Sequence, residues 1–300
     1  MSIVRRLWRS IAPNPLDRLL KQSKEKKHQR VLLVWNRGLG DIALGLYAII
    51  QRIKHFLPDA EIIFLTRKNL KEGFELLKGV EVIIAPTMSR KMPVNVAEQL
   101  KCLGLEASGF DLIIENPDPT YWVKWQLGKV VPRLNWKSEW NGLHERFSLD
   151  PSFEYIGAHV QTESGYASWR DWPTRHWERL FALLTQRSKT KILLFGFSKE
   201  PLFSHPSIID LRGETSLLEL LSIIKNRLST LIVPDSGIGT MTYFLDAAFP
   251  LKFISLWSEK NMGILKQNVA SPNPLLVHRP LMSIKRDLSL VTPERVYEEI

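Results

Sequence analysis

Short apolar runs alternate with amphipathic stretches along nearly the whole chain from residue 30 onward. The runs are typical of buried parallel strands, because they are continuous and rich in aliphatic side chains. The predicted strands are residues 30–35, 61–66, 80–85, 110–115, 129–134, 155–160, 191–196, 207–211, 229–234 and 251–257. The stretches between them have helical spacing, and the predicted helices are residues 42–53, 68–78, 93–105, 120–128, 173–187, 216–227 and 237–248. This succession of βα units predicts an α/β protein with mostly parallel sheets covered on both faces.

The alternation pauses over residues 135–152 and then restarts. A chain of 300 residues, 44% hydrophobic, can form two domains with cores of their own, since domains commonly have about 100–200 residues. We therefore expect two doubly wound, Rossmann-like parallel-sheet domains, residues 30–150 and 151–300, that face a cleft. Ligands of such domains bind outside the carboxyl ends of the strands, which places the expected site in that cleft.

Residues 1–29 form a basic extension ahead of these domains. The first 30 residues hold nine of the 41 Lys and Arg of the chain and only two acidic residues. Near the start, apolar residues that include Trp8 share one helical face, and Pro13 and Pro15 end that helix. A basic amphipathic helix of this kind can lie on an anionic membrane surface, which residues 1–28 would then contact. A solvated tail is the alternative, and the sequence leaves both open.

Composition also limits the compartment and the partners. No apolar run approaches the ~18 residues of a membrane-spanning helix, and the N-terminus lacks the continuous apolar stretch of a signal peptide. The one cysteine, Cys102, fits a reducing compartment. We expect a cytoplasmic protein, peripheral on the inner face of the cytoplasmic membrane if the extension binds lipid. No basic stripe interleaved with aromatic residues continues into the folded part, so no nucleic-acid partner is predicted.

The sequence RGLGDIALG, residues 37–45, lies between a predicted strand and a predicted helix. Gly38, Gly40 and Ala43 fit the spacing of a dinucleotide-binding turn. Asp41, however, would place negative charge beside the pyrophosphate. The acidic ribose ligand expected about twenty residues further on is replaced by Thr66-Arg67, which only a 2′-phosphate would suit. Asp41 could also serve simply as an acidic residue in the first turn of a helix.

A second loop of the same kind lies in LIVPDSGIGTMTYFLDA, residues 231–247. A predicted strand ends at Pro234, and the next six residues turn directly into a helix. Gly237 and Gly239 let the backbone approach a ligand closely, and the N–H groups of a first helical turn favour an anion. Ser236 and Thr240 add hydroxyl donors for phosphate oxygens. The alternative is that Asp235 or Ser236 merely caps the helix.

The segment SWRDWPTRHWERL, residues 168–180, places Arg170 just before another predicted helix. An arginine there can bind a phosphate or balance the charge of a leaving group. We interpret Trp172 and Trp177 as packing residues. The sequence predicts no metal site, because histidines such as His159 and His176 are scattered and no Cys/His cluster exists.

Four patches of the chain, in the right order, resemble glycosyltransferase family 9, the ADP-heptose:lipopolysaccharide heptosyltransferases. The resemblance runs from about residue 30 to the end. The patches are VLLVWNRGLGDIALGLYAI, RDWPTRHWERLFALL, IDLRGETSLLELLSIIKNRLSTLIVPDSGIGTM and LVTPERVYEEI. They are similar to the family's opening strand with its S-L-G-D turn, its K-x-W-P-x-x-x-W segment, its L-x-G-x-x-S-L-x-E-L…D-[ST]-G-x-x-H stretch and its closing helix.

The resemblance implies a GT-B fold and an inverting transferase that needs neither a metal nor a cofactor. It implies that Asp41 is the general base, on an acceptor-side loop that also contains Arg37, Gly38 and Gly40. The nucleotide-sugar donor would be held by Arg170, Asp235, Ser236, Gly237, Gly239 and Thr240, with the diphosphate on Arg170, Ser236, Gly237 and Thr240. The implied acceptor is a lipid-linked saccharide of lipopolysaccharide type.

The chain departs from the family pattern on the nucleotide side. Thr240 stands where the family has a histidine, Arg170 replaces a lysine, and the loop 257–263 differs from the family's donor loop. Two alternatives therefore stand beside a heptosyltransferase. One is a sugar-nucleotide epimerase on the same fold, and the other is a GT-B protein that has lost catalysis and binds a nucleotide or a partner.

Overall fold

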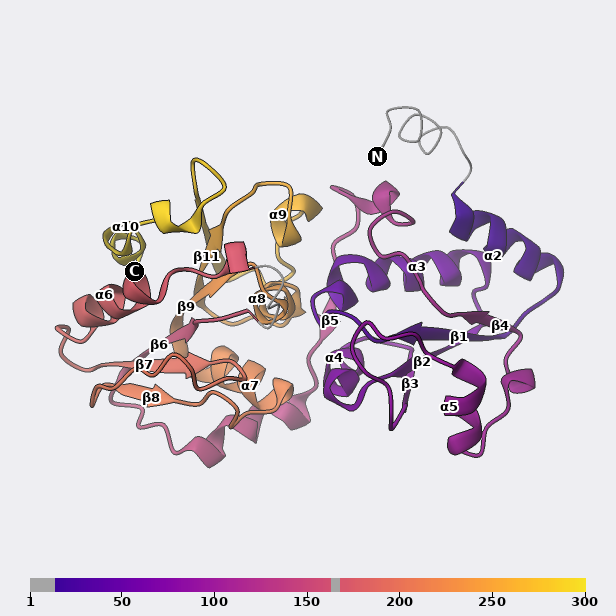
Figure 1. Cartoon of the computed structure of the whole chain (residues 1–300), viewed down its shortest axis with the longest axis horizontal. Helices are drawn as coiled ribbons and strands as arrows, with labels where there is room; N and C mark the ends of the chain where they lie inside the picture. The colour runs from indigo at the N-terminus through magenta and orange to yellow at the C-terminus, as the bar shows by residue number, and fades with distance from the viewer. Residues whose placement is uncertain (1–13, 163–167) are drawn as a thin grey trace. The chain divides into compact units, whose positions relative to one another are not determined.

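The computed structural model describes residues 14–162 and 168–300 and divides into two compact units, residues 1–129 and 130–300 (Figure 1). We call them unit 1 and unit 2 and describe each by itself. Each contains a parallel sheet, of four strands in unit 1 and six in unit 2. The predicted α/β class, with two Rossmann-like domains, is confirmed.

The sheet of unit 1 has the strand order β3-β2-β1-β4. Its strands are β1 (Arg30–Trp35), β2 (Glu61–Thr66), β3 (Glu81–Ile84) and β4 (Leu112–Ile114). β1 lies at the centre and pairs with β2 on one side and β4 on the other. A continuous aliphatic run is what such a central strand requires, because both of its faces are covered.

Helices cover the two faces of this sheet unequally. The helical elements between the strands are the π-helix η1 (Ile42–Leu46), α3 (Tyr47–Phe56), the 3₁₀ turn η2 (Lys68–Leu70), α4 (Lys71–Glu75), α5 (Val96–Cys102) and the 3₁₀ turn η3 (Ala107–Gly109). In Figure 1, α3 lies on one side of the strands and α5 on the other. Phe74 of α4 stacks on Phe64 of β2, with ring centroids 4.4 Å apart. Val96 and Leu100 of α5 pack against the opposite face, which carries Leu32.

Part of the basic extension belongs to the fold of unit 1. α2 (Pro15–Glu25) packs on α3, and Arg52 donates two hydrogen bonds, of 2.7 and 2.6 Å, to the Asp17 carboxylate. Leu16 and Leu20 are fully buried. The extension expected over residues 1–29 therefore divides at Asn14, which caps α2 by accepting from the Leu16 N–H. The predicted amphipathic helix, residues 1–13, lies outside the described residues.

The sheet of unit 2 has the order β12-β11-β9-β6-β7-β8, which is that of a dinucleotide-binding Rossmann domain. Its strands are β6 (Glu154–His159), β7 (Thr190–Phe195), β8 (Ile208–Asp210), β9 (Leu228–Pro234), β11 (Leu251–Trp257) and β12 (Leu276–Met282). The helices are α6 (Thr174–Leu184), α7 (Leu217–Arg227), α8 (Gly237–Tyr243), α9 (Gly263–Gln267) and α10 (Pro293–Glu298). The strand order reverses between β6 and β9, and ligands of this fold bind at such a switch point.

Unit 2 begins at residue 130, whereas we expected the second domain to begin at 151. The two-residue strand β5 (Leu134–Asn135) pairs with β10 (Leu245–Asp246). The following 3₁₀ segment η5 (Ser138–Phe147) packs on α7, where Arg146 forms an ion pair of 2.6 Å with Glu219. Residues 134–147 thus belong to unit 2 by their contacts, although their sequence is irregular.

Two predicted elements before this point are wrong, and two strands were missed, of which β10 lies within the helix predicted over residues 237–248. Residues 120–128 form turns and a 3₁₀ segment, η4 (Lys124–Gln126), where we predicted a helix. The strand predicted over 129–134 shrinks to the start of β5, since Pro132 cannot donate to a sheet. The longer missed strand is β12, an edge strand whose sequence contains Pro280. An edge tolerates proline and polar residues, which hide the apolar pattern.

The described residues contain no helix that is long and apolar enough to cross a membrane.

The packing of α2 predicts a measurable contribution to stability. Leu20→Ala should lower the free energy of unfolding in urea by about 2–5 kcal/mol, because it leaves a cavity between α2 and α3. The matched control Lys21→Ala changes an exposed neighbour and should shift stability by no more than about 0.5 kcal/mol. Equal effects of the two substitutions would contradict the docking of α2.

Candidate functional site

The turn that follows β1 holds Asp41 beside a glycine. A Cβ atom on Gly38 would lie 2.8 Å from Oδ2 of Asp41. Any side chain at position 38 would therefore crowd the Asp41 carboxylate, and glycine leaves room for it. The Trp35 indole N–H donates a hydrogen bond of 3.2 Å to the Gly38 carbonyl, which ties the turn to the end of β1. Gly40 accepts from the N–H of Leu44 at 3.0 Å. The glycines predicted for this loop therefore shape the surroundings of Asp41.

Asp41 precedes a π-helix, and its side chain makes no capping hydrogen bond to it. π-Helical turns are rare and occur often at functional sites. The turn also receives a second loop: a Cβ on Gly45 would lie 2.7 Å from Cα of Pro119, which follows β4. Without a capping hydrogen bond, the structural alternative for Asp41 is its negative charge at the N-terminus of a helix.

Basic residues surround this end of the unit 1 sheet. The guanidinium of Arg37, an exposed residue, lies over the Trp35 ring, 5.8 Å from its centroid. Arg67, which follows β2, donates to the Arg37 carbonyl over 3.0 Å. These cations and the Asp41 carboxylate stand at the carboxyl ends of β1 and β2. An anionic or hydroxyl-bearing ligand suits this edge of the sheet.

In unit 2, three segments meet at the carboxylate of Asp235, directly after β9. Arg170 lies 3.4 Å from its Oδ2, and a Cβ on Gly263 would lie 2.6 Å from its Oδ1. The carboxyl is nearly buried, at 12% side-chain exposure, and burial raises its pKa above the ordinary value. Arg170 opposes that shift by favouring the charged form. A raised pKa means that the ionised carboxylate costs stability at neutral pH, a cost typical of functional sites.

The predicted glycine-rich loop of unit 2 is held mostly by its own hydrogen bonds. Ser236 caps α8 by accepting from the Gly239 N–H at 3.1 Å, and the Thr240 hydroxyl donates to the Ser236 carbonyl at 3.0 Å. Thr240 is 3% exposed, so its hydroxyl holds the loop and is not offered to a phosphate. A Cβ on Gly239 would lie 3.0 Å from Val233, which explains that glycine by helix–sheet packing. Gly237 begins α8.

The segment before α6 connects both strands at the switch point. Arg170 reaches Asp235 after β9, whereas Asp171 accepts two hydrogen bonds of 2.7 Å from the backbone and hydroxyl of Thr162 after β6. Trp172 and Trp177 are buried in the core with ring centroids 4.8 Å apart, as predicted. The two tryptophans thus anchor the segment in the core, and Arg170 and Asp171 contact the loops that follow β9 and β6.

Sequence reasoning missed Gly263 and Thr162. The signal for Gly263 is that it stands between a loop and a helix with a φ of +46°, a conformation that favours glycine. Thr162 gave no signal, because its role depends on a contact with Asp171 across a loop. Among residues 14–162 and 168–300, no group of three or more His, Cys, Asp or Glu side chains could hold a metal ion.

The histidine that ends β6 is also buried at the switch point. His159 is 4% exposed, and burial lowers its pKa from 6.5 to about 4. Within the described part of the chain, its Nδ1 atom has no hydrogen-bond partner. Burial therefore favours the neutral imidazole of His159 in the unliganded protein.

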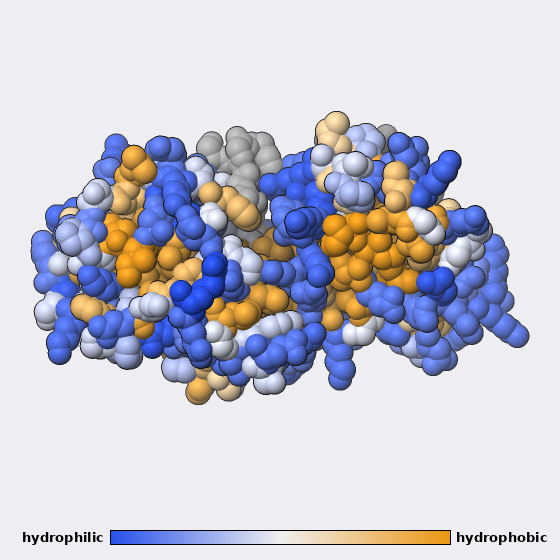
Figure 2. All heavy atoms as spheres, turned by 90° about the horizontal axis from the view of Figure 1, so that it is seen from below, coloured by the Kyte–Doolittle hydropathy of each residue, from blue (hydrophilic) through white to orange (hydrophobic). Residues whose placement is uncertain are grey.

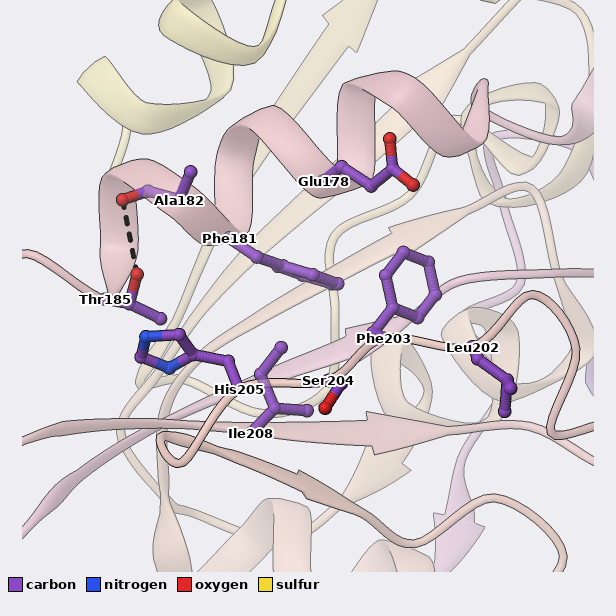
Figure 3. A pocket seen from close by; sticks show the side chains of 9 residues that line it. All are labelled: Glu178, Phe181, Ala182, Thr185, Leu202, Phe203, Ser204, His205 and Ile208. Carbon is purple, nitrogen blue, oxygen red and sulfur yellow. Dashed lines mark hydrogen bonds between the residues drawn. The ribbon is translucent and has the colours of Figure 1, made fainter.

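A cavity of about 310 Å³ lies elsewhere on unit 2 (Figure 3). Phe181 of α6 and Phe203 line it together and pack edge to face, with ring centroids 5.1 Å apart. The connection from β7 to β8, residues 196–207, contains no helix, so loop residues such as Phe203 line this side of α6. The cavity is lined partly by residues that precede β8, whereas the predicted site residues follow carboxyl ends of strands. It is therefore separate from the candidate donor site.

The buried histidine predicts a pH dependence of stability. Because the pKa of His159 is lower in the folded protein than the ordinary 6.5, the unfolded chain binds the proton first. Stability should therefore fall as the pH drops from 6.5 toward 4, by about 3 kcal/mol from this residue. Urea unfolding across that range should show the loss in the wild type and a smaller slope in His159→Leu. An unchanged slope would contradict burial of a neutral imidazole.

Comparison with known proteins finds likeness in structure alone. No protein-family model and no curated protein sequence matches the chain. Among solved structures, the ADP-heptose LPS heptosyltransferase II of E. coli has 16% sequence identity and a TM-score of 0.62, over 90% of this chain and 97% of that chain. A family 9 glycosyl transferase of Veillonella parvula has 15% identity and a TM-score of 0.60, over 90% and 95%.

The E. coli heptosyltransferase WaaC, solved with ADP, has 14% identity and a TM-score of 0.56, over 90% of this chain and 98% of that one. At such identities the likeness concerns the fold. The sequence patches and the structure thus indicate the same fold. The chain has the two-domain fold of the family 9 glycosyltransferases.

Proposed function

We propose that the protein is a glycosyltransferase that moves a heptose-like sugar from a nucleotide-sugar donor to a lipid-linked saccharide acceptor of lipopolysaccharide type. The observation that carries the proposal is the ion pair of the partly buried Arg170 with the nearly buried Asp235, at the switch point of a Rossmann-ordered sheet. A carboxyl group whose pKa is raised by burial marks a candidate functional site, and the neighbouring guanidinium of Arg170 can bind an anion. The fold shared with WaaC, whose solved structure contains ADP, supports a nucleotide as that ligand.

On the donor side, Arg170 is the residue that we expect to contact the diphosphate. Its guanidinium can donate to phosphate oxygens and balance the charge that grows on the leaving group. Asp235 holds that guanidinium and orients the loop after β9. We expect the backbone of Ser236, Gly237 and Gly239 to contact the donor. Thr240 stabilises the loop through the hydrogen bond from its hydroxyl to the Ser236 carbonyl. Because Arg170 supplies a fixed positive charge, we propose transfer that does not depend on a metal.

On the acceptor side, Asp41 acts as the general base. Its carboxylate takes the proton of the acceptor hydroxyl as the hydroxyl oxygen attacks the anomeric carbon. The bond between that carbon and the diphosphate oxygen breaks, and the nucleoside diphosphate leaves with the electron pair. A single displacement of this kind inverts the anomeric configuration and forms no covalent enzyme intermediate. Arg37 and the glycines Gly38 and Gly40 shape the loop that presents Asp41.

The base is tested by Asp41→Asn, which keeps the shape of the side chain and removes its basicity. Transfer should fall about 10²–10⁴-fold, the usual contribution of a general base, while donor affinity changes little. Transfer is measured as release of nucleoside diphosphate from ADP-, GDP- and UDP-sugars in the presence of a lipid-linked saccharide extract. The control Asp59→Asn alters an exposed carboxylate of unit 1 and should leave the rate unchanged. Retained transfer in Asp41→Asn would overturn the assignment.

The donor site is tested by Arg170→Met, with Arg175→Met as the matched control on the exposed start of α6. Titration with nucleoside diphosphates should show about tenfold or greater loss of affinity for Arg170→Met, since a charge-assisted hydrogen bond is worth about 1.5–3 kcal/mol. Arg175→Met should bind as the wild type does. A wild type that binds nucleotide and transfers nothing, with every sugar tried, would favour a protein that has lost catalysis.

A further inference from the structure

One face of the unit 1 sheet is covered at its centre, where Leu32 and Val34 are 0% and 3% exposed, and incompletely around its rim. Parallel sheets normally bury both faces under helices. Among the described residues of unit 1, the face that carries Leu32 and Val34 receives the seven-residue α5 and the turn η3. The chain after β4 packs on the α3 side instead, where Gln126 donates to the Leu44 carbonyl and Arg52 lies over the Trp125 ring.

The incomplete cover leaves apolar side chains in contact with solvent. Seen from the α5 side, unit 1 shows a broad hydrophobic area, on the right of Figure 2. The partly buried apolar residues on this side are Ile83, Met88, Val94, Ala107 and Ile113. Met92 is 61% exposed. A contiguous apolar surface of this kind on a soluble unit marks an interaction site.

The loop between β3 and α5, residues 86–95, combines this apolar character with positive charge. Its sequence is PTMSRKMPVN, and no acidic residue occurs from 82 to 97. Arg90 and Lys91 stand between Met88 and Met92, and Lys91 and Met92 are both exposed. This combination matches an anionic lipid surface. The apolar side chains would enter the membrane interface, and the adjacent cations would contact the anionic headgroups.

The same loop is fastened to the turn that carries Asp41. The side-chain amide of Asn36 donates to the carbonyls of Ser89 and Met92, at 3.0 and 2.8 Å. Lys91 in turn donates its backbone N–H to the Asn36 carbonyl at 3.3 Å. Asn36 directly follows β1 and lies five residues before Asp41 in the chain. A membrane bound by the loop would therefore lie close to the turn that carries Asp41, the proposed general base.

We propose that residues 86–95 form a lipid-contacting loop, which binds an anionic membrane surface and thereby presents a membrane-anchored acceptor to the Asp41 turn. The second half of this statement rests on the proposed function. The first half concerns lipid binding alone and is measured without any transfer reaction. Met88, Met92 and Val94 supply the apolar contact, and Arg90 and Lys91 supply the charge.

The test is sedimentation with vesicles of phosphatidylglycerol and phosphatidylcholine, compared with vesicles of phosphatidylcholine alone. Met92→Asp should weaken binding to the anionic vesicles about tenfold or more, because it removes an apolar contact and adds a repelled charge. Lys91→Glu should weaken it about tenfold by reversing one charge. The control Leu202→Asp changes a leucine of unit 2 that is 71% exposed and should bind as the wild type does.

The contribution of residues 1–13 is separated by repeating the series in a chain that lacks them. The loop should retain anionic-vesicle binding there, and Met92→Asp should still reduce it. Binding that disappears with residues 1–13 and ignores Met92→Asp would overturn the proposal, as would equal binding to phosphatidylcholine alone. A wild-type dimer in solution that Met92→Asp dissociates would also overturn it, since the surface would then bind a second copy.

Failure of the lipid proposal is distinguishable from failure of the transferase proposal. Asp41→Asn should lower nucleoside diphosphate release about 10²–10⁴-fold and leave vesicle binding unchanged. Met92→Asp should weaken vesicle binding and leave release with a detergent-dispersed acceptor unchanged. Loss of that release in Met92→Asp would place the loop in the catalytic machinery and contradict its assignment to lipid.

Discussion

The nearly buried carboxylate of Asp235 organises the candidate donor site of unit 2. It follows β9, contacts the backbone that begins α9 and pairs with Arg170 from the segment before α6. A Cβ on Gly263 would also lie 2.6 Å from the Trp257 ring, so residue 263 must lack a side chain. The Trp257 indole donates to the Ser255 hydroxyl, whose oxygen lies 2.7 Å from Nε2 of His278. Burial lowers the pKa of His278 to about 4, which keeps this chain of hydrogen bonds neutral.

Burying the ionised carboxylate of Asp235 lowers the stability of the folded protein, but it holds Arg170 in a defined position. A carboxyl group whose pKa is raised by burial would be more stable protonated, yet Arg170 holds a positive charge against it. His159 is likewise buried with an unpartnered Nδ1 in the described chain. Proteins accept such costs where a ligand completes the hydrogen bonds or where a charge must be held ready. Both groups stand at the switch point, where the strand order reverses.

In unit 1, the corresponding constraint is the glycine turn around Asp41. Gly38 leaves room for the carboxylate, and Gly45 leaves room for the loop that contains Pro119. Asn36 joins this turn to residues 86–95 through two side-chain hydrogen bonds. The proposed base and the proposed lipid-contacting loop thus share one anchor, which would let a membrane-bound acceptor approach a rigid turn.

Much of the fold could be predicted from the sequence, because central parallel strands need continuous aliphatic runs. β1 and β2 coincide with their predicted ranges for this reason. Edge strand β12 and residues 134–147 could not be predicted, since their pairing depends on partners distant in the chain. The loops that contain Asp41 and Asp235 could be predicted, because in the sequence each combines spaced glycines with a preceding apolar strand. The contact of Arg170 with Asp235, the bond from Thr240 to Ser236 and the burial of His159 required three-dimensional positions.

The central claim is that a nucleotide-sugar donor binds at the switch point of unit 2. Amide hydrogen exchange of the full chain, with and without ADP, GDP or UDP, measures this most directly, because bound ligand slows exchange in the backbone that it contacts. The account predicts that at least one nucleotide protects residues 160–162, 168–171, 234–240 and 257–263. Protection of residues 178–185 and 201–208, around the separate cavity, with no change at the switch point would contradict it. Unchanged exchange with all three nucleotides at saturating concentration would contradict it as well.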